Sequence, residues 1–196
     1  FAISSLGFRG EALSSIAAVA EVEMITKTPE ALIGVRYLMN GSKEEKMEEV
    51  GAPSGTSVMV RHLFYNTPAR KKFLKKPRRE GAAVGDLLEK LALDNPHIAF
   101  HLINDKKEVF SSSGSGDLKE LIYRIYGKEI AGALIPLHVK GDGMALHGFL
   151  GEPVVNRANR NQELFFVNGR YVRNSLLSGA LEEGYQQYLM QHRFPF

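Results

Sequence analysis

A serine- and glycine-rich segment, Ser111–Gly116, constrains the fold of this chain more than any other feature. The strand and helix patterns before it end in a hairpin, and a new pattern starts with a helix after it. Such a composition is typical of a flexible connection. A chain of 196 residues has the length of one large domain or two small ones. We therefore expect two domains, residues 1–112 and 117–196.

The first half predicts an antiparallel hairpin near its middle. Asn40-Gly41 is a preferred pair for a two-residue turn between strands. The run 43–49 that follows is rich in Lys and Glu. Charge on an edge strand discourages unwanted pairing, so we expect this run to form an exposed edge.

Helices flank the predicted strands of the first half. Apolar residues at helical spacing follow the opening loop, and a strand run begins at Thr56. Asn66 or Thr67 can cap a basic helix that starts at Pro68. A longer helix ends before Asn95. The apolar stripes are expected at Leu13, Ile16, Val19 and Ala20, and at Val84, Leu87, Leu88 and Leu91.

The second half predicts two helices around a group of strands. Asp117 is suited to cap the first helix, which we expect to end at Gly127. Two strand runs follow around a "KGDG" turn, and "ELFFVNG" is a strand that enters a further turn. Asn174 opens the last helix.

The stretch "GFRGEAL", Gly7–Leu13, has the features of an anion-binding loop. A glycine-rich turn at a helix N-terminus leaves backbone N–H groups unpaired, and the helix dipole adds positive charge there. Phosphate binds such sites. The stretch lacks the Lys of a Walker A loop and the spacing of the dinucleotide motif. On spacing alone, a plain tight turn before a helix stays open as the alternative.

Two basic stretches lie within a chain of net charge +3. Residues 61–79 carry Lys and Arg and no acid. Residues 154–176 carry four arginines against Glu163 alone. Uneven charge of this kind indicates contact with a polyanion, and solvated surface is the alternative. The candidate arginines are Arg157, Arg160, Arg170 and Arg173.

Composition excludes several other kinds of chemistry. The sequence has no cysteine, which excludes disulfides and thiolate-bound zinc. No apolar run reaches the length that crosses a bilayer, so we expect no membrane contact. The histidines show no metal-ligand spacing, and no Ser-His-Asp arrangement can be argued. We therefore predict neither a metal site nor catalytic residues in this chain.

Three motifs identify a family resemblance that covers the whole chain. "GFRGEALSSIA", "GTSVMVRHLFYNTPARKKFL" and "FFVNGRYVRN" resemble the MutL family of DNA mismatch repair ATPases, in the same order. The resemblance implies an α+β fold. A two-layer α/β sandwich of the type shared with gyrase, Hsp90 and histidine kinases would be present in its later part. A transducer domain like domain 2 of ribosomal protein S5 would follow.

The resemblance also implies the residues of two sites. Backbone amides of the lid, at Gly7, Arg9, Gly10, Ala12 and Leu13, would hold the ATP phosphates. Thr56 would hold the adenine through ordered water. The "NTPAR" turn would tie the sheet to its basic helix through Asn66 and Pro68, while Arg70 would contact a phosphate or form an ion pair. In the transducer domain, Arg157, Arg160, Arg170 and Arg173 would contact DNA phosphates.

The chain also departs from the family pattern. The catalytic Glu, the magnesium-binding Asn and the Asp-Gly segment that reads adenine are not in this sequence, and neither is the transducer lysine. Both ends resemble cut ends. We therefore expect a fragment without ATPase activity that binds ATP weakly or not at all, whereas the parent would use ATP and magnesium.

The implied partners of the parent are DNA, a MutS-like mismatch recognition protein and a second copy that associates on ATP binding. The implied location is the bacterial cytoplasm, with the DNA. Two alternatives remain open at this point. One is a non-enzymatic nucleic-acid-binding module with an S5-like domain, and the other is a related ATPase such as a topoisomerase subunit.

Overall fold

The computed structural model describes residues 11–141 and 143–196, which divide into two compact units. The first unit ends at Lys76 and the second begins at Pro77. Each unit has a hydrophobic cluster of its own. The combination of helices and antiparallel sheets agrees with the predicted α+β class.

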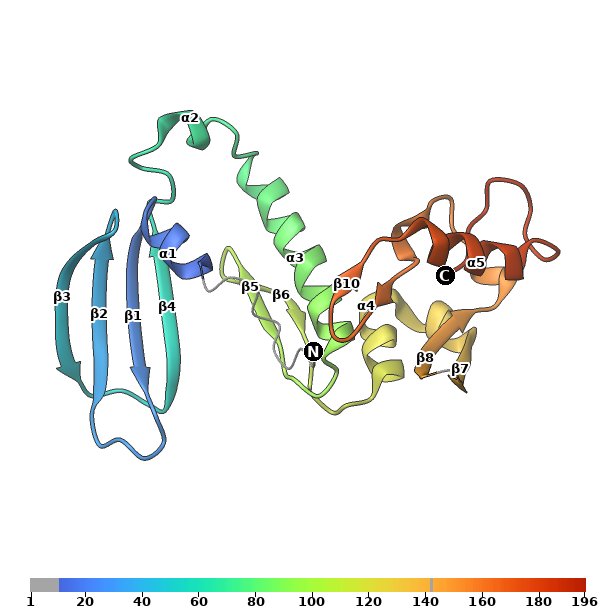
Figure 1. Ribbon diagram of the computed structural model, residues 1–196, viewed down its shortest axis with the longest axis horizontal. Coiled ribbons are helices and arrows are strands. Elements are labelled where there is room, and N and C mark those ends of the chain that lie inside the picture. Colours follow the sequence, from blue (N-terminus) through green and yellow to red (C-terminus); the bar gives the residue numbers. More distant parts are fainter. Residues whose placement is uncertain (1–10, 142) are drawn as a thin grey trace. The chain divides into compact units, whose positions relative to one another are not determined.

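The first unit is built on a four-stranded antiparallel sheet with the order β3-β2-β1-β4 (Figure 1). The predicted charged edge strand is confirmed, because β3 lies at the edge and pairs only with β2 among the described strands. The elements are α1 (Ala12–Ala17), β1 (Glu21–Lys27), β2 (Gly34–Asn40), β3 (Lys43–Val50), β4 (Gly55–Arg61) and α2 (Pro68–Lys71).

The predicted hairpin turn lies one residue later than the sequence indicated. Asn40 pairs with Lys43, so the two loop residues are Gly41 and Ser42. Their φ angles are 54° and 67°. A type I′ turn, one of the two-residue turns that match the strand twist, has positive φ at both positions, and Ser42 adopts this conformation beside the glycine.

The buried hydrophobic cluster of the first unit includes fewer residues of the predicted helical stripe than we expected. Ala17, Ala20 and Val22 are buried, and Met39 packs against them. By contrast, Leu13 and Ile16 of α1 are exposed. The helix ends at Ala17, because the chain turns there toward β1.

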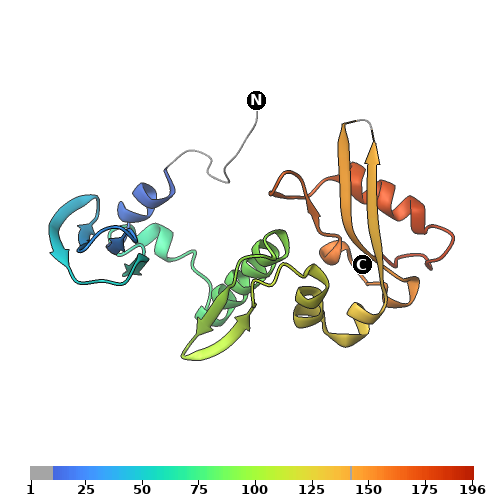
Figure 2. The same cartoon turned by 90° about the horizontal axis from the view of Figure 1, so that it is seen from below.

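The second unit contains three two-stranded antiparallel sheets among its described residues, β5–β6, β7–β8 and β9–β10 (Figures 1 and 2). Its elements are α3 (Pro77–Asp94), β5 (His101–Asn104), β6 (Lys107–Ser111), α4 (Leu118–Gly132), β7 (Leu134–Gly141), β8 (Met144–Gly151), η1 (Pro153–Val155), η2 (Arg160–Gln162), β9 (Phe165–Phe166), β10 (Tyr171–Val172) and α5 (Ser175–Tyr185).

The core of this unit joins segments on both sides of Ser111–Gly116. Ala92 and Leu93 of α3 lie in one cluster with Leu121 and Ile122 of α4. The phenylalanines that pack around this cluster are Phe100, Phe110, Phe149, Phe166 and Phe196. Of the predicted α3 stripe, Val84, Leu87 and Leu91 are exposed instead.

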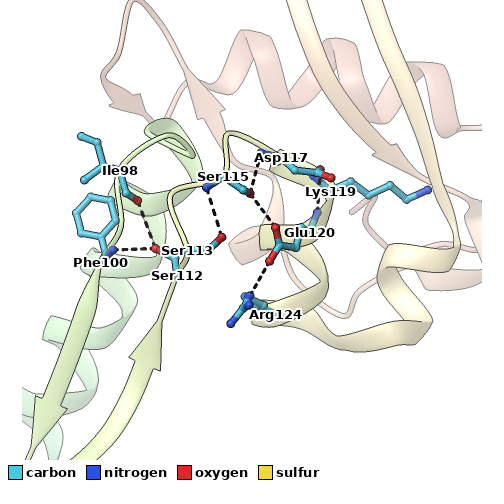
Figure 3. A network of polar contacts seen from close by, with 9 residues as sticks. All are labelled: Ile98, Phe100, Ser112, Ser113, Ser115, Asp117, Lys119, Glu120 and Arg124. Carbon is cyan, nitrogen blue, oxygen red and sulfur yellow. Dashed lines mark hydrogen bonds and ion pairs between the residues drawn. The ribbon is translucent and has the colours of Figure 1, made fainter.

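The Ser-Gly segment is an ordered turn and not a flexible connection (Figure 3). The Ser112 N–H donates to the Phe100 carbonyl at 2.8 Å, and the Phe100 N–H donates to Ser112 Oγ at 2.9 Å. Ser115 Oγ donates to Glu120 of α4 at 2.8 Å. Gly114 has φ of 69°, and a Cβ there would lie 2.7 Å from the Ala99 nitrogen. The expectation of a flexible segment is therefore wrong, and the assignment of residues 1–112 and 117–196 to two domains stays a prediction.

Helix α4 begins as predicted, and its first helical segment ends at Gly127 as predicted. Asp117 Oδ1 accepts hydrogen bonds from the N–H groups of Lys119 and Glu120, at 2.8 and 3.0 Å. Gly127 has φ 87° and ψ 177°, which breaks the helix. A second helical segment then runs to Gly132. Gly127 thus ends the first helical segment and forms a kink before the second.

Candidate functional site

The predicted phosphate loop lies mostly outside the described residues. Gly7, Arg9 and Gly10 belong to the part that is not described. Ala12 and Leu13 form the first turn of α1 and are exposed. The assignment of these residues to ATP phosphates stays a prediction.

Thr56 lies in β4 directly opposite Thr26 of β1. Their Oγ1 atoms are 2.8 Å apart, and the Thr56 residue is exposed. A hydroxyl donates one hydrogen bond and accepts others, so each Thr retains capacity for a water or a ligand. Sequence reasoning did not find Thr26, because its role depends on strand pairing. The register of β1 and β4 is the signal that identifies it.

Arg61, the first residue of the basic stretch 61–79, forms an ion pair with Glu23 of the same unit. Its guanidinium donates to Glu23 at 2.8 Å, and Arg36 donates to the other Glu23 oxygen at 2.8 Å. Hydrogen bonds from Arg61 and then Arg36 hold the pKa of Glu23 below its ordinary value. Arg61 therefore stabilises the polar face of the sheet.

Asn66 and Pro68 of the "NTPAR" turn make local structural contacts, and the role of tying the sheet to the basic helix stays a prediction. Asn66 Nδ2 donates to the Ala18 carbonyl at 2.9 Å, and Pro68 is the first residue of α2. Thr67 occupies the N-cap position, but its hydroxyl forms no capping hydrogen bond in the described structure. Arg70 is exposed near the end of α2. The basic helix is short, at four residues.

Arg157 is built into the second unit by its backbone and its side chain. Its N–H and C=O form an antiparallel bridge with Phe194, at 2.8 and 2.9 Å. The guanidinium lies 5.6 Å from the centre of the Phe196 ring, and its Nε donates to Gln162. A residue with these contacts fixes the chain end against the loop before β9.

Arg160 is exposed but paired. Its Nε donates to Glu182 Oε1, and its Nη2 donates to Oε2 at 3.0 Å. The guanidinium also lies 4.6 Å from the centre of the Phe194 ring. The Glu182 carboxylate raises the pKa of Arg160 and is itself held at a lowered pKa by the arginine. Glu163 is the acid that lies within residues 154–176, yet the acid that pairs with Arg160 is Glu182.

Arg170 and Arg173 border the short strand β10. Asn168 and Gly169, with φ of 50° and 73°, form the turn that precedes Arg170. Within the described residues, no hydrogen bond or ion pair engages the Arg170 guanidinium. Arg173 is exposed, and its Nε donates to the Tyr171 hydroxyl at 3.1 Å. Both arginines therefore retain N–H donors for an anion.

The described part of the chain contains neither a candidate metal-binding group nor a candidate membrane-spanning helix. Over residues 11–141 and 143–196, no group of three or more His, Asp or Glu side chains is placed to hold a metal ion. None of the described helices is long and apolar enough to cross a membrane.

Comparisons with known proteins address the family directly. A family model described as "DNA mismatch repair protein, C-terminal domain" matches residues 122–196. The DNA mismatch repair protein MutL of Agathobacter rectalis is 52% identical over 194 residues, which is 99% of this chain and 30% of that protein. MutL of Caldanaerobacter subterraneus subsp. tengcongensis is 42% identical over 195 residues, which is 100% of this chain and 33% of that protein.

The chain belongs to the MutL family. This confirms the resemblance read from the three motifs. The MutL chain spans about a third of the length of these curated relatives.

Solved structures agree with the family assignment. The Aquifex aeolicus MutL ATPase domain, complexed with ADP, is 28% identical, with a TM-score of 0.72 over 95% of this chain and 70% of that chain. A structure titled as the N-terminal domain of a DNA repair protein has a TM-score of 0.79 at 23% identity, over 98% of this chain and 63% of that chain, and supports the fold alone. The predicted fold class is thereby confirmed.

Proposed function

We propose that this MutL segment contributes a DNA phosphate-binding surface and one side of an ATP site to a mismatch repair protein. Arg170 carries the first part of the proposal, because its guanidinium has no partner among the described residues. Arg173 lies three residues later and keeps free N–H donors beside Tyr171. Contacts of this kind go to phosphates, so binding would depend strongly on salt and weakly on sequence.

The nucleotide part of the proposal rests on Thr56 and its partner Thr26. Two hydroxyls 2.8 Å apart at the surface suit a water-mediated contact to a purine. ATP and magnesium would bind the parent protein, with the lid residues Gly7, Arg9, Gly10, Ala12 and Leu13 at the phosphates. The segment alone, without the catalytic Glu, would hydrolyse no ATP. The MutL structure complexed with ADP is consistent with nucleotide binding in the parent.

In the parent, ATP binding would drive association of two copies and relay mismatch recognition by a MutS-like protein to strand cleavage. Its place of action would be the bacterial cytoplasm, at the DNA. The bacterial MutL relatives support this assignment.

The test of the DNA surface is a salt titration of binding. Fluorescence anisotropy with a labelled duplex compares the wild-type chain with Arg170→Ala/Arg173→Ala between 50 and 200 mM salt. The slope of log K against log salt should become shallower by about 0.9 for each lost phosphate contact.

Lys119→Ala/Lys128→Ala is the matched control. Both lysines are exposed on α4, and their removal lowers the net charge by the same amount. The control should retain the wild-type slope. If the wild-type chain and Arg170→Ala/Arg173→Ala had equal slopes of log K against log salt, the proposed DNA surface at β10 would be wrong.

A further inference from the structure

The guanidinium of Arg160 is held by an acid in the geometry that it would use for a phosphate. Both carboxylate oxygens of Glu182 accept N–H groups of Arg160, one of them at 3.0 Å. Arginine binds carboxylate and phosphate through the same pair of parallel hydrogen bonds. Glu182 therefore occupies the position that an incoming phosphate oxygen pair would take.

This ion pair lies at the edge of an open cavity of about 590 Å³. The cavity is lined by the second half of α5 and by the segment 189–195, and it includes Arg193 and His192. The Arg160 side chain is 59% exposed, and that of Glu182 is 27% exposed. Because the Arg160 side chain is mostly exposed, another anion that reaches the cavity can compete with Glu182 for its N–H groups.

A second acid, Glu163, lies close to Glu182. Glu163 is 5% exposed. Burial is the main cause that raises the pKa of its carboxyl, and the nearby Glu182 carboxylate adds to this. The acid whose carboxylate oxygens accept the Arg160 N–H groups is Glu182. Glu183 is the next acid along α5, is exposed and lines the same cavity.

We propose that Glu182 is a built-in competitor of DNA phosphate at Arg160, so that this arginine is withheld from DNA until a phosphate displaces the carboxylate. The inference rests on the proposal that this segment binds DNA phosphates, and it adds a regulated arginine outside β10. The Phe194 ring, 4.6 Å from the guanidinium, adds a cation–π contact that does not depend on which anion Arg160 binds.

The test compares three single variants, two on α5 and one at Glu163, between η2 and β9. Glu182→Gln removes the competing charge at Arg160. Glu183→Gln makes the same change in net charge one residue away, without freeing an arginine. Glu163→Gln replaces a buried carboxyl by a neutral isostere. Each is measured by anisotropy with the same labelled duplex between 50 and 200 mM salt, and circular dichroism checks the fold.

Glu182→Gln should bind DNA at least threefold more tightly at 50 mM salt, with a slope that is steeper by about 0.9. Glu183→Gln should keep the wild-type slope, because long-range charge alone adds no contact. Glu163→Gln should bind like wild type. The gain in DNA affinity should disappear in Arg160→Ala/Glu182→Gln, because this double variant lacks the arginine that Glu182 would otherwise occupy.

The measurements distinguish a failure of this inference from a failure of the DNA surface proposed at β10. If Glu182→Gln and Glu183→Gln bind DNA alike, Glu182 is no competitor, even where Arg170→Ala/Arg173→Ala weakens binding. If that double variant binds like wild type while Glu182→Gln still gains, the surface at β10 is wrong and the inference stands. Absence of binding in every variant overturns both.

Discussion

The Tyr185 hydroxyl donates a 2.6 Å hydrogen bond to the carbonyl of Gly151. Tyr185 ends α5, and Gly151 ends β8. The Gly151 N–H donates to the Phe196 carbonyl at 2.8 Å, and a Cβ on Gly151 would lie 2.8 Å from the Phe196 Cβ. Three segments of the second unit therefore meet around a backbone position that has no room for a side chain.

Tyr185→Phe should destabilise the second unit by about 1–3 kcal/mol, because it leaves a buried carbonyl without its donor. The measurement is urea unfolding followed by circular dichroism. Tyr188→Phe is the matched control, since this side chain is 69% exposed and its change should stay within about 0.5 kcal/mol. Equal midpoints for the two variants would contradict the structural importance of this bond.

Gly127→Ala should destabilise the chain by about 1–3 kcal/mol. Gly127 has φ 87° and ψ 177°, a region that side-chain-bearing residues avoid. Gly132, the last residue of α4, is the control, because a Cβ there would meet open space and its φ lies outside the left-handed region. Gly132→Ala should be neutral or stabilising by up to about 1 kcal/mol. Thermal unfolding of both variants measures the difference, and a harmless Gly127→Ala would argue against the kink.

Asp117→Ala should cost about 1 kcal/mol, since it removes the acceptor for two N–H groups at the start of α4. Asp117→Asn retains an oxygen in the same place and should stay close to wild type. Hydrogen exchange of the Lys119 and Glu120 amides reports the loss locally. Faster exchange in both variants would mean that the carboxylate charge, and not the acceptor, stabilises the helix.

Glu23→Gln should destabilise the first unit at neutral pH, and this deficit should shrink in acid. The arginines lower the pKa of Glu23 in the folded chain, so its contribution is present above the ordinary value of 4.5 and is lost as pH falls through the lowered value. Urea unfolding at pH 7 and at stepwise lower pH measures the trend. Glu49→Gln, exposed on β3, is the control and should show little change. A deficit that stays constant in acid would contradict the assigned ion pairs.

Local signals in the sequence predicted most elements, because they act within a few residues. Asp117 and Asn174 cap the helices that follow them, and the charged run 43–49 forms the edge strand. The Ser-Gly segment was misjudged from composition. Its order depends on the Phe100 backbone and on Glu120, and neither contact can be read from a serine-rich run.

The candidate site was only partly readable for the same reason. The sequence identified Arg160 and a nearby acid, but not which acid pairs with it. Glu163 is three residues away in the chain and buried, whereas Glu182 is twenty-two residues away and forms the ion pair. Likewise, Thr56 was named by resemblance, while its partner Thr26 emerges only from the pairing of β1 with β4.

The two arginines on Glu23 also define the alignment of three strands. Arg36 reaches Glu23 from β2, and Arg61 reaches it from β4. A slip of either partner strand by one residue would turn its arginine to the opposite face of the sheet. The slipped sheet would then leave a mostly buried carboxylate short of a counter-charge. Glu23 thus penalises misaligned pairings, and this ion-pair cluster helps to select one sheet among the near-equivalent arrangements that the strands could adopt during folding.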